Sequence, residues 1–167
     1  QSYSEDEGVF TAQIYEPPLQ YHYLKRPYEL VPATVDAVPV PRFYDSAGRE
    51  LPHDAAIEQI AESVYELKLK PGIRYQPHPA FALDAQGQPE YLGADIARGR
   101  QVISDFPSVG TRELTADDYI YQIKRLAHPR LHSPVLELMG DYIVGLKDLH
   151  ARLLADEKTR SAKGEGG

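Results

Sequence analysis

The chain has 167 residues, a length that fits one domain with a core of its own. Its 25 acidic and 18 basic residues give a net charge of -7, and the basic residues are scattered, which disfavours binding to nucleic acid. Cysteine is absent, which excludes disulfides, thiolate metal sites and cysteine nucleophiles. No apolar run approaches the ~20 residues that cross a membrane. No signal peptide is recognisable, and the ends suggest a processed or excised piece.

The first two-thirds of the chain is rich in proline, because twelve of the fourteen prolines lie at or before Pro107. Proline locks φ and removes a donor, so we expect short elements and many loops in this part. One helix is predicted at the start. Ser4 and Glu7 have the spacing of a capping box, and Pro17 and Pro18 end the helix.

Extended segments follow. Residues 29–40 are apolar but contain Pro32 and Pro39, which favours extended edge structure. The turn signal Asp-Ser-Ala-Gly at residues 45–48 predicts a hairpin after residues 42–44.

Residues 64–70 alternate between apolar and charged side chains, which predicts a half-buried strand. Pro71 and Gly72 then fit a type II turn, in which glycine supplies a positive φ. A second turn signal, Asp-Ala-Gln-Gly at residues 84–87, resembles the first.

The remainder of the chain has helical periodicity. Thr115 is the predicted N-cap of a helix with Asp117 and Asp118 in its first turn, and Pro129 ends it. The sequence Ser133-Pro134 opens the last helical region.

Gly140 and Gly145 are positions where that last region can divide into two helices. From Lys158 the chain is polar and rich in glycine, so we expect one subdomain over residues 1–157 and a disordered tail over 158–167.

The change from period 2 to period 3.6 near residue 115 predicts an α+β fold. We expect a small mixed or antiparallel sheet with helices packed on one of its faces. The predicted core consists of Tyr65, Leu67, Leu69, Ile120, Ile123, Leu138 and Leu146.

Sequence signs of catalysis or metal binding are weak. The chain has no dinucleotide-binding glycine motif, no phosphate-binding loop and no serine elbow. His128 and His132 have a spacing that could hold zinc on a helix, but Pro129 between them should keep them off one helical face. Asp117 and Asp118 point about 100° apart on a helix, so they favour a helix-start role. We therefore expect no catalytic residues, no structural metal, no cofactor and no enzyme activity.

Twelve tyrosines are present, and four of them cluster near the start of the chain. These are Tyr15, Tyr21, Tyr23 and Tyr28. A tyrosine offers a large apolar face and a polar tip, which suits either a small core or a docking surface. Packing in the core is the favoured interpretation.

Three segments in order resemble family 5 extracellular solute-binding proteins, the dipeptide, oligopeptide and nickel binders. The first is "IYEPPLQY" followed by "ELVPATV", at residues 14–21 and 29–35. The second is "SVYELKLKPGIRYQP" at residues 63–77, and the third is "RELTADDYIYQIKRLAHPRLHSP" at residues 112–134. The resemblance covers most of residues 3–150. Compared with the family, residues 36–62 are longer than usual and residues 80–111 form a further insertion.

The resemblance implies that this chain is the small subdomain of the first lobe of a two-lobed binding protein. Such a protein is the periplasmic substrate-binding component of an ABC importer, and it delivers peptides or similar solutes to a permease in the inner membrane. Two places would come closest to the ligand by this resemblance. One is the segment Tyr3, Ser4 and Glu5, and the other is Val135, where some members have a tyrosine whose hydroxyl this chain lacks.

Two other classes of function stay open. One is a free-standing protein-interaction domain that docks partners on its tyrosine- and proline-rich half. The other is a small hydrolase, which would need a convergent nucleophile and base that the sequence does not show.

Overall fold

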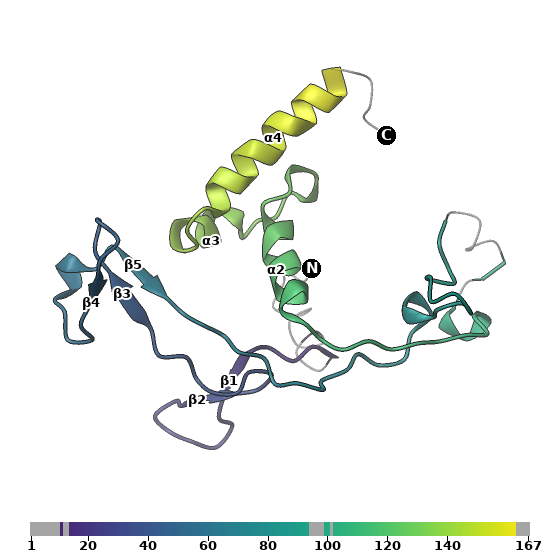
Figure 1. Cartoon of the computed structure of the whole chain (residues 1–167), viewed down its shortest axis with the longest axis horizontal. Coiled ribbons are helices and arrows are strands. Elements are labelled where there is room, and N and C mark those ends of the chain that lie inside the picture. The colour runs from purple at the N-terminus through teal and green to yellow at the C-terminus, as the bar shows by residue number, and fades with distance from the viewer. Residues whose placement is uncertain (1–10, 12–13, 94–98, 101, 163–167) are drawn as a thin grey trace. The chain divides into compact units, whose positions relative to one another are not determined.

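The described chain forms two compact units, which we call the strand unit (described residues within 8–114) and the helix unit (described residues within 115–167). The computed structural model describes residue 11 and residues 14–93, 99–100 and 102–162 (Figure 1). The capping box predicted at Ser4 and Glu7 lies outside the described residues. Near the predicted end of that first helix, Thr11 and Ile14 are helical, and residues 15–17 are not.

The strand unit contains two small antiparallel sheets. In the first, β1 (Leu19–Tyr21) pairs with β2 (Leu30–Pro32). In the second, β3 (Arg42–Tyr44) lies between β4 (Glu50–Leu51) and β5 (Glu62–Val64). The predicted α+β class is confirmed, but its strands form two sheets where one was expected.

The hairpin predicted at residues 45–48 is confirmed. Asp45 Oδ1 accepts hydrogen bonds from the backbone N–H groups of Ala47 and Arg49, both at 2.9 Å, and Gly48 has a φ of 76°. Asp45 Oδ2 also accepts from the Arg49 guanidinium at 2.8 Å. A carboxylate that closes its own turn in this way explains why aspartate begins the motif.

The second predicted turn is confirmed by the same geometry. Asp84 Oδ1 accepts from the backbone N–H groups of Gln86 at 2.9 Å and Gln88 at 2.8 Å. Gly87 supplies the positive φ, 75°, that ends the turn. Short 3₁₀-helices cover Ile57–Gln59, Pro79–Phe81 and Ile103–Asp105 in the strand unit.

Asp45 should make the first hairpin sensitive to acid. The backbone N–H of Arg49, followed by its guanidinium and the N–H of Ala47, holds the pKa of Asp45 below its ordinary value of 3.8. A lowered pKa means that Asp45 stabilises the hairpin fully above 3.8 and that this contribution is lost as the pH falls through the lowered value. NMR titration of the Asp45 carboxyl should give the low midpoint, and Arg49→Gln should move that midpoint upward. Glutamine keeps the backbone N–H, so an unchanged midpoint in Arg49→Gln would contradict the contribution assigned to the guanidinium.

The strand predicted at residues 64–70 forms only in part, and this is a correction. β5 ends at Val64, and pairing resumes at an isolated antiparallel bridge between Leu69 and Val35. Residues 65–68 are in no strand and no turn. The turn after them is confirmed, with Gly72 at a φ of 79°.

The predicted core is wrong for most of its members. Among the described residues the buried apolar side chains are Val35, Ala82, Ala127 and Leu146, together with Pro79 and the polar Thr34. Leu146 was predicted correctly, and Leu69 is half-buried. The other predicted core residues are exposed, namely Tyr65, Leu67, Ile120, Ile123 and Leu138. Periodicity identifies side chains that share a face, but it cannot show whether another element covers that face.

The helix unit begins as predicted. α2 (Ala116–Leu126) starts with a capping box, because the Thr115 N–H donates to Asp118 Oδ2 at 2.9 Å and the Asp118 N–H bonds back to Thr115. Asp117 and Asp118 lie in the first turn, where negative charge suits the helix dipole. The helix ends before Pro129, which opens a 3₁₀-helix at Pro129–Leu131.

Two further helices, α3 (Leu136–Tyr142) and α4 (Leu146–Ala162), follow Ser133-Pro134. Gly145, at a φ of 80°, separates them, whereas Gly140 lies inside α3. The predicted tail needs correction, because residues 158–162 are the last turns of α4. Residues 163–167 lie outside the described part. Packing of these helices on a face of a sheet stays a prediction. No helix in the described ranges is long and apolar enough to cross a membrane.

Candidate functional site

The structure describes one of the four residues that were predicted to lie near a ligand. Tyr3, Ser4 and Glu5 fall outside the described residues. Val135 lies directly before α3, half-buried, and its carbonyl accepts a hydrogen bond from the Met139 N–H at 2.9 Å. Its apolar side chain can contribute packing to a ligand but no hydrogen bond.

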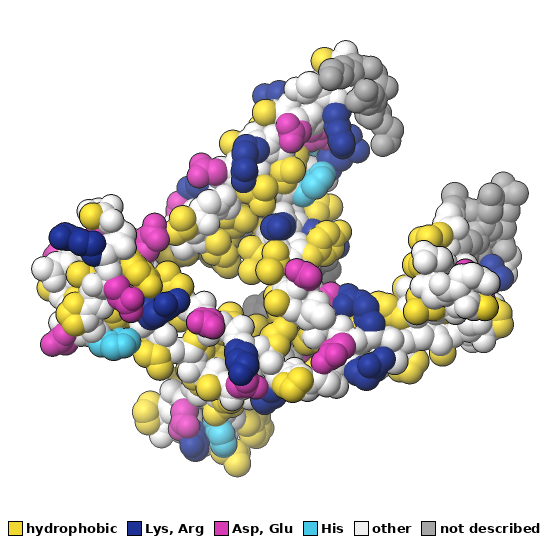
Figure 2. Space-filling model, in the orientation of Figure 1, with side chains coloured by type: hydrophobic (Ala, Val, Ile, Leu, Met, Phe, Trp, Pro, Cys, Tyr) yellow, Lys and Arg dark blue, Asp and Glu magenta, His cyan; other side chains and the backbone are white. Residues whose placement is uncertain are grey.

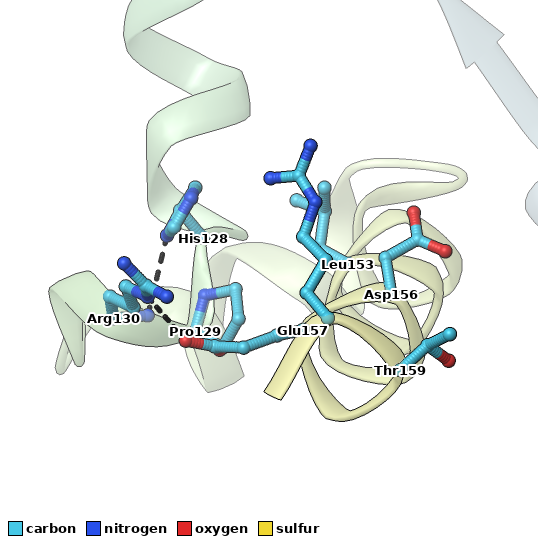
Figure 3. A pocket seen from close by; sticks show the side chains of 8 residues that line it. His128, Pro129, Arg130, Leu153, Asp156, Glu157 and Thr159 are labelled. Atoms are coloured by element: carbon cyan, nitrogen blue, oxygen red, sulfur yellow. Dashed lines mark hydrogen bonds and ion pairs between the residues drawn. The ribbon is translucent and has the colours of Figure 1, made fainter. Parts of the chain in front are cut away.

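A groove of about 540 Å³ lies within the helix unit, between the 3₁₀-helix at Pro129–Leu131 and α4 (Figure 3). It is lined by His128, Pro129, Arg130, Leu153, Asp156, Glu157, Thr159 and Arg160. The sequence analysis missed this groove, because its two walls are 23 or more positions apart and no motif joins them.

Charges of both signs line the groove, and one ion pair lies within it. The Arg130 guanidinium pairs with the Glu157 carboxylate at 2.5 Å, and the backbone N–H of Arg130 donates to His128 Nδ1 at 3.3 Å (Figure 3). Arg160 and Asp156 add one further charge of each sign. Balanced charges and one internal ion pair give the groove no preference for anions or for cations.

The two histidines considered for zinc do not share a helical face, as expected. His128 precedes the 3₁₀-helix and His132 follows it in the left-handed region, at a φ of 44°. Within the described ranges no group of three or more His, Asp or Glu side chains could hold a metal ion.

A smaller, mostly apolar pocket of about 230 Å³ lies in the strand unit. It is lined by His78, Pro79, Ala80, Tyr91, Ile103 and Phe106. The rings of Tyr91 and Phe106 meet edge to face, with centroids 5.1 Å apart, and the Arg100 guanidinium lies over both rings. The pocket could take one apolar side chain, and it contains no convergent nucleophile and base.

The clustered tyrosines are on the surface, so the favoured interpretation of core packing is wrong. Tyr15, Tyr21, Tyr23 and Tyr28 are between 65% and 88% exposed. Three of them lie on the hairpin formed by β1, β2 and their connection, which we call the tyrosine hairpin (residues 19–32). The Tyr21 and Tyr28 rings meet edge to face at 5.6 Å, and the Arg26 guanidinium lies 4.4 Å from the Tyr28 ring centroid.

Asp45 and Lys147 have displaced pKa values, and both displacements stabilise a charged side chain. Asp45 is lowered within its turn, as described above. The Asp141 carboxylate, which accepts a hydrogen bond from the Lys147 ammonium, raises the pKa of Lys147. Each shift moves the group away from neutral pH, so neither prepares an acid or a base for proton transfer.

Comparisons with known proteins add no relative: no family model, no curated protein and no solved structure matches this chain.

Proposed function

We propose that this chain is a subdomain of the first lobe of a periplasmic solute-binding protein that serves an ABC importer for peptides or similar solutes. The observation that carries the proposal is the pairing, within the strand unit, of the segments that resemble the family.

The first links join the earliest motifs. β1 and β2 belong to "IYEPPLQY" and "ELVPATV", and beyond them the Ala33 N–H donates to the Pro18 carbonyl at 3.0 Å. The "ELVPATV" segment then pairs with the second motif, because the Lys70 N–H donates to the Thr34 carbonyl at 2.9 Å. Thr34 and Val35 are fully buried at this junction. The motif residues therefore include the largest fully buried side chains among the described residues.

The second motif in turn pairs with the start of the third. The Leu114 N–H donates to the Ile73 carbonyl at 2.8 Å, and Arg74 pairs with Glu113 in an antiparallel bridge. Segments 14–21, 29–35, 63–77 and 112–114 thus follow one another side by side. Three short motifs that matched by chance would have no reason to form one continuous set of pairings.

Only the second insertion leaves and returns at neighbouring points. Residues 36–62 depart beside Lys68, whose carbonyl accepts from the Asp36 N–H at 2.9 Å, and they return at β5, with the extended residues 65–68 between the two points. Residues 80–111 depart after His78, which exchanges two backbone hydrogen bonds with Gly110. An excursion whose ends lie together can be added without disturbing the segments that carry the resemblance.

Exposed apolar surface supports the idea of a part that other protein covers. Large hydrophobic side chains are exposed in both units, and Figure 2 shows such side chains in yellow among the charged ones. Exposed hydrophobic side chains in both units suit a part that other protein covers.

The proposal assigns a peptide or similar solute as ligand and the inner-membrane permease as partner, with Tyr3, Ser4, Glu5 and Val135 as the residues nearest the ligand. One subdomain supplies one wall of such a site. A ligand against one wall stays largely solvated, so its contacts would not exceed the several kcal/mol that association costs.

The proposal is tested by calorimetric titration of short peptides into two proteins, the product of the complete reading frame that encodes this chain and the 167-residue chain by itself. We expect the complete product to bind short peptides and the 167-residue chain to show no measurable binding. In the complete product, Glu5→Ala should weaken binding without changing stability, with Glu58→Ala at an exposed position as the control. Micromolar binding by the 167 residues alone, or a complete product that binds no solute, would overturn the proposal.

The alternative function is a protein-interaction domain, which the exposed tyrosine hairpin favours. Tyr23 is 88% exposed at its connection, and Tyr21 and Tyr28 flank it. Tyrosine is enriched at protein interfaces because it combines apolar area with a polar tip. If the complete reading frame ends with these 167 residues, this alternative replaces the first proposal.

A further inference from the structure

The chain after β5 has one paired edge and one open edge. β5 is the outer strand of its sheet, and the chain continues from it without a turn to residue 70 (Figure 1). At the far end, the Lys68 carbonyl accepts a hydrogen bond from the Asp36 N–H, and the Lys70 N–H donates to the Thr34 carbonyl. Successive residues of an extended chain point their backbone N–H and C=O groups to opposite edges. The backbone groups of Leu67 and Leu69 therefore point away from the segment that contains Thr34.

The open edge carries unused donors and apolar side chains. In the described part of the chain, the N–H groups of Tyr65, Leu67 and Leu69 donate to no backbone carbonyl. Tyr65 is 57% exposed and Leu67 is 46% exposed. An open edge with strand-forming side chains is a template for pairing with another strand.

We propose that this edge pairs with the same edge of a second copy of the chain, antiparallel, about a two-fold axis at Leu67. In this register each Leu67 faces the other Leu67, and Tyr65 faces Leu69 of the second copy. These odd-numbered residues form the hydrogen-bonded pairs, because their backbone groups point to the open edge. The even-numbered residues form the pairs whose side chains approach most closely.

Charge complementarity identifies the second copy as the occupant. About this axis, Glu66 of each copy faces Lys68 of the other, so two opposite-charge pairs form in the closely spaced positions. Moving the axis to residue 66 would place two glutamates together, and moving it to residue 68 would place two lysines together. A shift by one residue would set apolar side chains against charged ones. The sequence therefore favours the register centred on Leu67 over its neighbours.

Competition from existing contacts is small. Lys68 lies 3.7 Å from the Asp36 carboxylate, but its side chain is 82% exposed, and exposed ion pairs contribute little. Pro71 has no N–H to donate, so strand pairing should stop there. An interface of this length is at the small end of specific interfaces, and we expect a dissociation constant of roughly 1–100 µM.

Charge reversal at the two paired positions tests the proposal in the full 167-residue chain. Sedimentation equilibrium should show a reversible dimer. Glu66→Lys alone and Lys68→Glu alone should each weaken it about tenfold, because each turns both cross-strand pairs repulsive. The double variant Glu66→Lys/Lys68→Glu should restore the dimer. Mixing the two single variants should give a heterodimer in preference to either homodimer.

Several outcomes would overturn the proposal. They are a chain that stays monomeric up to its solubility limit, a dimer that tolerates the single changes, and a double variant that stays as weak as the singles. Circular dichroism of each variant would show that the fold is retained, and Glu58→Lys provides a matched change away from the edge. Hydrogen exchange at Tyr65, Leu67 and Leu69 should slow as the concentration rises. The proposal does not depend on the transport function, because dimerisation of the 167 residues can fail or succeed whether or not a longer product binds peptide.

Discussion

Leu146→Ala is expected to lower the free energy of unfolding of the helix unit by about 2–5 kcal/mol. Leu146 begins α4 and is 3% exposed, so truncation removes buried methyl groups and leaves a cavity beneath the helix. Urea denaturation followed by the helical circular dichroism signal would report the change as a lower midpoint.

Leu138→Ala is the matched control, because it makes the same chemical change in the neighbouring helix. Leu138 lies in α3 and is 60% exposed, so its truncation should cost less than about 1 kcal/mol. Equal midpoint shifts for the two variants would show that some other element covers Leu138. In a product that contained the covering part, the Leu138→Ala effect should grow.

Gly110→Ala is expected to destabilise the strand unit by about 3 kcal/mol. Gly110 pairs with His78, and a Cβ added at this position would overlap the backbone carbonyl of Phe81. Backbone atoms cannot move aside as a flexible side chain can, so the return of the 80–111 excursion would have to shift. The measurement is the urea midpoint, read from the fluorescence of the tyrosines in the strand unit.

Gly48→Ala separates this steric effect from the cost of backbone strain. Gly48 has a φ of 76° and nothing within 4 Å of an added Cβ, so alanine there should cost only about 1 kcal/mol. A Gly110→Ala variant as stable as Gly48→Ala would mean that residues 80–111 return by a different path.

Local chemistry was sufficient to predict several elements from the sequence. Thr115 and Asp118 form the expected capping box, and the aspartates at 45 and 84 close their turns. Gly145 breaks the last helical region where glycine was expected to do so. In each case the interacting groups lie within four residues of one another, so their geometry follows from the sequence without help from the rest of the fold.

Residues far apart in the chain decided the rest. Helical periodicity predicted both Leu138 and Leu146 as core residues, and regular alternation predicted Leu67. Only Leu146 is buried, because burial depends on whether another element covers the face on which a side chain lies. β5 ends at Val64 because its partner strand β3 begins at Arg42, directly after Pro41, which has no N–H for a further pair. The groove on α4 forms only because residues 128–130 pack beside residues 153–160, which are far away in the sequence. Contacts of this kind depend on how distant segments pack, which no local pattern of side chains can specify.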